Sequence, residues 1–136
     1  MSAAAELRDP ALHVLHKEIL FDKMLAFSGF PETNSVHTSR EVAAERGLPN
    51  AIAQGLQMYA YMCEWLVDYF GKDWFEGGNL AVSFIGIVVP GDHLTVRAAL
   101  KDSEPVDGGV RATLEIWCEN HRGQKVAAGT ASAVAR

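Results

Sequence analysis

The sequence has few cysteines and no excess of positive charge. Cys63 and Cys118 are its two cysteines, and they are not at metal-ligand spacing. This disfavours a disulfide framework and indicates reduced thiols in the core. Lysine and arginine together number 12 against 17 acidic residues, a formal net charge of −5. General binding to nucleic acid or to anionic membranes needs a basic face, so the composition argues against both.

The sequence also lacks long apolar runs, linkers and internal repeats. No run of apolar residues approaches the length of a membrane span, and the first 13 residues do not have the pattern of a leader peptide. We therefore expect a cytoplasmic protein without a membrane anchor. At 136 residues and 49% hydrophobic content, the chain is sufficient for one domain, spanning residues 1–136, with a substantial core.

One long helix is predicted within residues 51–70. Apolar side chains recur along one face at helical spacing, and we expect this face to be buried: Leu56, Tyr59, Ala60, Cys63, Leu66, Val67 and Phe70. A second row is also apolar: Met58, Tyr61, Met62, Trp65 and Tyr69. Only Gln57, Glu64 and Asp68 are clearly polar. A helix that is apolar over most of its circumference should be surrounded by other structure, and a curled sheet is the simplest solution.

The rest of the chain predicts short helices and a sheet. We expect helices at 21–27 and 40–46, a first strand at 13–19, and a later antiparallel meander of four strands at 80–89, 94–100, 110–119 and 125–135. The bulky Trp74 and Phe75 should cover an edge of the core. Gly129, inside the last strand, indicates close approach by the helix or a partner. The order of elements predicts an α+β fold.

Three stretches together resemble a known family. They are HTSREVAAERGLPNAIAQGLQ at 37–57, the long helix that follows, and FIGIVVPGD at 84–92 with its Pro-Gly-Asp turn. In this order they are similar to the MaoC-like dehydratases and (R)-specific enoyl-CoA hydratases. The resemblance covers roughly residues 13–135. It implies the hot-dog fold, in which an antiparallel sheet wraps around one long central helix.

The resemblance also implies a set of site residues. His37 matches the catalytic histidine, Asn34 the asparagine of its loop, and Gly55 the glycine of the oxyanion hole. The sequence departs from the family pattern at three positions: Glu32 stands in place of aspartate, Ser35 in place of proline, and Gln54 in place of histidine. We expect His37, Glu32 and Gly55 to be catalytic, and Asn34 and Gln54 to contact the substrate.

These residue types suit hydration of a 2-enoyl thioester. The reaction needs a base to activate water, an acid for the α-carbon and donors for the enolate oxygen. His37 and Glu32 could hold one water between them, while the N–H of Gly55, at the positive end of the long helix, could meet the thioester carbonyl. The predicted activity is that of a hydro-lyase acting on acyl-CoA or acyl-carrier thioesters in fatty acid or polyketide metabolism. No cofactor or metal is predicted.

Two other functions are open at this point. A hot-dog thioesterase often uses an acidic residue on the central helix, and Glu64 and Asp68 lie there. A non-catalytic thioester-binding subunit, paired with an active relative, would explain the altered aspartate and histidine positions. The resemblance further implies a homodimer or a heterodimer with a similar hot-dog chain, because a lone curled sheet leaves edges that need covering. The acyl group is not predicted.

Overall fold

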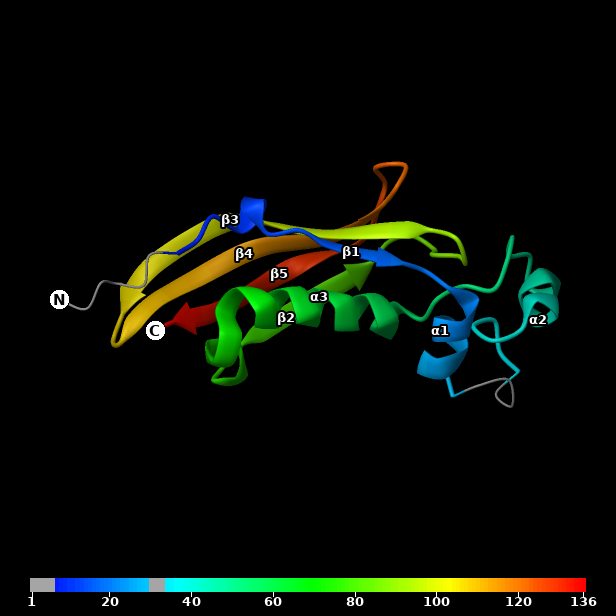
Figure 1. Cartoon of the computed structure of the whole chain (residues 1–136), viewed down its shortest axis with the longest axis horizontal. Helices are drawn as coiled ribbons and strands as arrows, with labels where there is room; N and C mark the ends of the chain where they lie inside the picture. The colour runs from blue at the N-terminus through cyan, green and yellow to red at the C-terminus, as the bar shows by residue number, and fades with distance from the viewer. Residues whose placement is uncertain (1–6, 30–33) are drawn as a thin grey trace.

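The computed structural model describes residues 7–29 and 34–136. Its helices and strands follow one another as η1 (Pro10–Leu12), β1 (Leu15–Glu18), α1 (Phe21–Phe27), α2 (Arg40–Glu45), α3 (Gly55–Phe70), η3 (Gly71–Phe75), β2 (Asn79–Phe84), β3 (His93–Val106), β4 (Gly109–Asn120) and β5 (Lys125–Ala135). Figure 1 shows α3 lying along the sheet, with α1 and α2 gathered at the end where α3 begins. The α+β hot-dog architecture predicted from the sequence is confirmed.

The five strands form one antiparallel sheet in the order β1-β3-β4-β5-β2. The predicted four-stranded meander is wrong in one respect. Strands β3, β4 and β5 are successive neighbours, but β2 pairs with β5, its Val82 lying opposite Gly129. It therefore occupies the edge opposite to β1. The physical reason is that the periodicity within a strand shows which face is buried and does not encode which distant strand it pairs with.

Alternating side chains define the two faces of the sheet. On β4, Ala112, Leu114, Ile116 and Cys118 are buried, whereas their neighbours along the strand are more exposed. This is the period-2 pattern of a strand with one face on the core. The predicted bounds of α1 and β5 are confirmed, and α2 begins as predicted, with the hydroxyl of Ser39 accepting a hydrogen bond from Val42 N at 3.2 Å.

Helix α3 packs on the sheet through a different face from the one expected. Its buried side chains are Gln57, Met58, Met62, Trp65, Leu66, Tyr69 and Phe70. The predicted face is wrong in part: Leu56 is 60% exposed and Ala60 is exposed too, whereas Leu66 and Phe70 are buried as predicted. Both rows of the helix are apolar, and the sheet covers it from one side, so hydrophobic spacing alone does not decide which row is inside.

The predicted strand through 85–89 ends early. The N–H groups of Ile85 and Gly86 both donate to the carbonyl of Val126, which stops the regular ladder between β2 and β5. Farther on, Val88 is buried, and its carbonyl accepts from Ala53 N at 2.8 Å. This segment therefore joins the chain that precedes α3 rather than extending the sheet.

Two predictions about packing need correction. A Cβ at Gly129 would overlap the carbonyl oxygen of Ala81, so within the chain the close neighbour is strand β2 rather than the helix. After α3, Trp74 stacks on Phe70 with ring centroids 6.1 Å apart and covers the core as expected. Phe75 does not, because its side chain is 73% exposed.

The cysteines are not bonded to each other. Cys118 is buried in the core, where desolvation, with a smaller effect from neighbouring Glu119, raises the pKa of its thiol to about 12. Cys63 lies half-buried on α3, and burial raises the pKa of its thiol as well. Both thiols therefore stay protonated near neutral pH. None of the helices in the described ranges is long and apolar enough to cross a membrane.

Candidate functional site

His37 lies in a tight turn held by its own neighbours. Ser35 N donates to the Thr38 hydroxyl at 2.8 Å, and Thr38 N donates to the Ser35 carbonyl at 3.1 Å. The N–H of His37 donates to the Ser35 hydroxyl at 3.2 Å. Serine and threonine hydroxyls thus satisfy the backbone of this turn. The serine that replaces the family proline keeps the loop closed by hydrogen bonding.

The ring of His37 is oriented by the segment that leads into α3. Its Nδ1 lies 2.8 Å from the carbonyl oxygen of Ile52. A carbonyl only accepts, so Nδ1 carries the proton and donates it. In the neutral ring Nε2 is then the basic nitrogen. The Ile52 N–H also donates to the Val36 carbonyl at 3.0 Å, so two hydrogen bonds tie the His37 turn to this segment.

The first turn of α3 begins at Gly55 without a side-chain cap. Gln54 occupies the N-cap position, but its side chain makes no capping hydrogen bond. Its amide nitrogen donates instead to the Ser28 hydroxyl, 2.8 Å away at the end of α1. The N–H groups of a helix's first turn lack intrahelical partners and carry a partial positive charge. The N-terminus of α3 is therefore suited to hold a developing negative charge.

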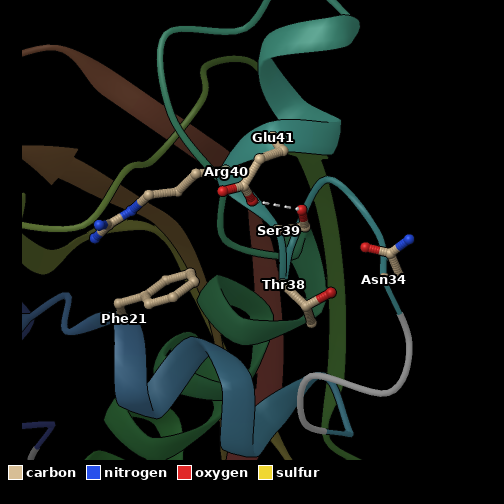
Figure 2. A pocket seen from close by; sticks show the side chains of 6 residues that line it. All are labelled: Phe21, Asn34, Thr38, Ser39, Arg40 and Glu41. Carbon is tan, nitrogen blue, oxygen red and sulfur yellow. Dashed lines mark hydrogen bonds between the residues drawn. The ribbon is translucent and has the colours of Figure 1, made fainter.

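A cavity of about 390 Å³ lies beside the His37 turn. Figure 2 shows its lining: Phe21, Asn34, Thr38, Ser39, Arg40 and Glu41. Asn34 has a φ of 41°, in the left-handed region that asparagine tolerates better than most residues. The Arg40 guanidinium lies 4.7 Å from the centre of the Phe21 ring. Neither His37 nor Gly55 belongs to this lining, so the cavity adjoins the predicted catalytic groups without including them.

Among the predicted residues, His37 is hydrogen-bonded to Ile52, which precedes Gln54 and Gly55 in the segment leading into α3. Asn34 lines the neighbouring cavity. Glu32 lies outside the described residues. Gln57 is one of the three clearly polar residues of the central helix, yet it is only 3% exposed. Its amide nitrogen donates to the Tyr61 hydroxyl at 2.9 Å, while its oxygen has no partner within the described ranges. The sequence pattern gave no signal that this glutamine would be buried.

The acidic residues of the central helix have other partners. Glu64 pairs with Lys17 of β1 at 2.8 Å. Asp68 is exposed near the C-terminal end of α3, with an oxygen 3.9 Å from His13 Nε2. Over residues 7–29 and 34–136, no cluster of three or more histidine, cysteine, aspartate or glutamate side chains is arranged to hold a metal ion.

Comparison with known proteins places the chain in a family. The model of the MaoC like domain matches residues 9–117. The chain belongs to the MaoC-like family. Within it, the enoyl-CoA hydratase ChsH3 of Mycobacterium tuberculosis is 32% identical over 97 residues, which cover 71% of this chain and 34% of that protein. This MaoC-like chain thus spans about a third of the curated relative's length.

Solved structures share the architecture of this MaoC-like chain at low identity. The (R)-hydratase of A. caviae involved in PHA biosynthesis superposes with a TM-score of 0.80, at 21% identity, over 98% of this chain and 100% of that one. A chain of the ChsH1-ChsH2 complex of Mycobacterium tuberculosis superposes with a TM-score of 0.74, at 12% identity, over 90% and 93%. At these identities the likeness supports the hot-dog fold alone.

Proposed function

We propose that this chain is a hydratase or dehydratase that interconverts 2-enoyl and 3-hydroxyacyl thioesters of CoA or of an acyl-carrier protein. The observation that carries the proposal is the hydrogen bond from His37 Nδ1 to the Ile52 carbonyl, 2.8 Å long, next to the uncapped start of α3. It leaves Nε2 as a base on a turn that is tied to the segment leading into α3, and the N–H groups at the start of that helix carry a partial positive charge. An acid–base group next to an oxyanion site is what hydration requires.

The reaction then proceeds in two proton transfers. His37 Nε2 takes a proton from water as the water oxygen bonds to the β-carbon. The electron pair of the carbon–carbon double bond shifts to the thioester oxygen, which accepts a hydrogen bond from Gly55 N–H. The electron pair on the enolate oxygen then returns through the carbonyl as the α-carbon takes a proton from the protonated His37 Nε2, which regenerates the neutral ring and completes the 3-hydroxyacyl product. We assign Glu32 as the carboxylate partner of His37 on the shared water, and Asn34 and Gln54 as groups that position the loop and substrate.

The assay that tests this function follows crotonyl-CoA. We expect absorbance of the enone to fall when purified protein is added, without release of free CoA thiol. The absence of thiol release separates a hydratase from a thioesterase. The thioesterase alternative has weaker support, since Glu64 is ion-paired with Lys17 and Asp68 is near the C-terminal end of α3, away from Gly55. Thiol release at unchanged double-bond absorbance would contradict the proposal.

We also propose that two hot-dog chains pair through the β2 side of the sheet. β2 has a neighbour on one edge only, and exposed apolar side chains lie just beyond its end and at the start of α3: Leu56, Ile85 and Ile87. We call these three the apolar surface. An unpaired strand edge beside apolar side chains favours association with another chain. The occupant is a second copy or a similar hot-dog chain.

We expect a dimer by light scattering at micromolar concentration. Replacing Ile85 and Ile87 together with lysine should weaken the dimer at least about tenfold, because two charges would be buried at the contact. Leu12→Lys is the matched control, since Leu12 is also an exposed apolar residue but lies away from the apolar surface. A monomeric native protein, both alone and mixed with a MaoC-like relative, would contradict this pairing.

A further inference from the structure

Phe84 lies against the start of the central helix. It is the last residue of β2 and shares the α3-facing side of the strand with Leu80 and Val82, which pack on the core. An added Cβ on Gly55 would lie only 2.9 Å from two carbons of the Phe84 ring. The three atoms nearest to that position all belong to this ring. Glycine at position 55 thus permits a contact that a side chain would prevent.

The ring is covered on one side only. Phe84 remains 47% exposed although it contacts the backbone of α3. Opposite it on β5 stands Ala127, whose small side chain is fully buried and leaves the ring free to lean toward the helix. The exposed part of the ring is therefore a flat apolar surface directly beside the N-terminus of α3.

Two segments approach Gly55 from different parts of the chain. The His37 turn is tied to Ile52 in the segment that leads into the helix, and Phe84 comes from the end of β2. A thioester whose carbonyl oxygen accepts from Gly55 N–H must place its α-carbon close to the same glycine. The aromatic ring then borders the α-carbon.

From this geometry we propose that Phe84 determines substrate specificity at the α-carbon: its ring is the wall that accepts an unbranched acyl chain and rejects an α-methyl group. The proposal rests on the proposed function, because it uses Gly55 N–H as the thioester contact. A flat ring held against the helix backbone has little room to move away from a branch. One methyl group too many in a fitted apolar site typically changes selectivity by about 10–200-fold.

Binding of two saturated thioesters tests the wall without involving catalysis. Propionyl-CoA and isobutyryl-CoA differ by one methyl on the α-carbon, and neither has a double bond to hydrate. By titration calorimetry we expect the native protein to bind propionyl-CoA at least about tenfold more tightly. In Phe84→Ala this preference should fall to about twofold or less. Phe84→Leu, which keeps an apolar side chain, should give an intermediate ratio and serves if the alanine variant does not fold.

Phe75→Ala is the matched control, because it removes the same ring from an exposed position at the other end of α3. It should keep the native ratio. The same affinity ratio in the native protein and in folded Phe84 variants would contradict the proposed role of Phe84. So would an equal change of this ratio in Phe75→Ala, or failure of the native protein to bind either thioester. Selective binding without hydration of crotonyl-CoA would reject the proposed reaction and keep the wall. Hydration with a ratio insensitive to Phe84 would reject the wall alone.

Discussion

Replacing His37 with alanine is expected to lower the turnover number for crotonyl-CoA hydration by about 10²–10⁴-fold, the usual contribution of a positioned acid–base group. The ring is held through Nδ1 on the Ile52 carbonyl, which keeps Nε2 available for the proton of water. Removing the ring deletes the base. It leaves the uncapped N-terminus of α3 in place, so thioester binding should change much less than turnover. Stopped reactions with crotonyl-CoA measure both quantities.

His16→Ala provides the control for this substitution. His16 is exposed on β1, with Nδ1 3.1 Å from the Thr95 hydroxyl, and has no contact with the segment before α3 among the hydrogen bonds of the described residues. Its variant should keep the native rate within about twofold. Glu32→Gln run alongside tests the carboxylate assigned from the sequence. Unchanged turnover in a folded His37→Ala protein would reject histidine catalysis.

The local elements were predictable because their signals are local. Alternation in 110–119 matches β4, the turn at Arg122-Gly123 precedes β5 at 125–135, and the Ser39 cap marks the start of α2. The position of β2 was not predictable in this way. Val82 of β2 pairs with Gly129 of β5, 47 residues later in the chain. No spacing within β2 encodes which free edge of the sheet it joins. Pairing of this kind is decided by the whole chain.

The choice of site residues stays a prediction. His37 and Gly55 were predicted through the ordered motifs, and the structure connects them through the segment before α3. The contact that orients the ring was not predictable, because the acceptor is a backbone carbonyl 15 residues away and every residue has one. Phe84 also gave no signal of its own. Its contact with Gly55 depends on β2 reaching the start of α3, which is a consequence of the sheet order.

The buried face of α3 was predicted only in part, and the cause also identifies the residue that anchors the helix. Both rows of the helix are apolar, so their hydrophobicity is similar, but only one row contains Trp65, the largest fully buried side chain. Its indole N–H donates to the carbonyl of His13 at 2.8 Å, and its ring stacks on Tyr69 with centroids 5.0 Å apart. Trp65 thus connects α3 to His13, in the segment that leads into β1, and packs on Tyr69, one turn farther along the same helix.

We therefore expect Trp65→Ala to lower the free energy of unfolding by about 3–5 kcal/mol, the range for removing a large buried aromatic side chain. The substitution leaves a cavity between α3 and the sheet and removes the donor to the His13 carbonyl. In a chain of 136 residues this loss corresponds to a fall in melting temperature on the order of 10–20 °C. Urea unfolding followed by circular dichroism measures the free energy directly.

Trp117→Ala tests whether the position of a tryptophan, rather than its residue type, decides how much stability is lost. Trp117 lies on the opposite face of β4 from the core, partly exposed, and its indole N–H also has a partner, Glu119 Oε1 at 3.1 Å. Because water can fill the space left there, we expect a loss of about 1 kcal/mol, the typical cost of a point substitution. Equal losses in the two variants would mean that α3 is not anchored through Trp65. A large loss of stability in Trp65→Ala alone would show that α3 contacts the sheet through the row that contains Trp65.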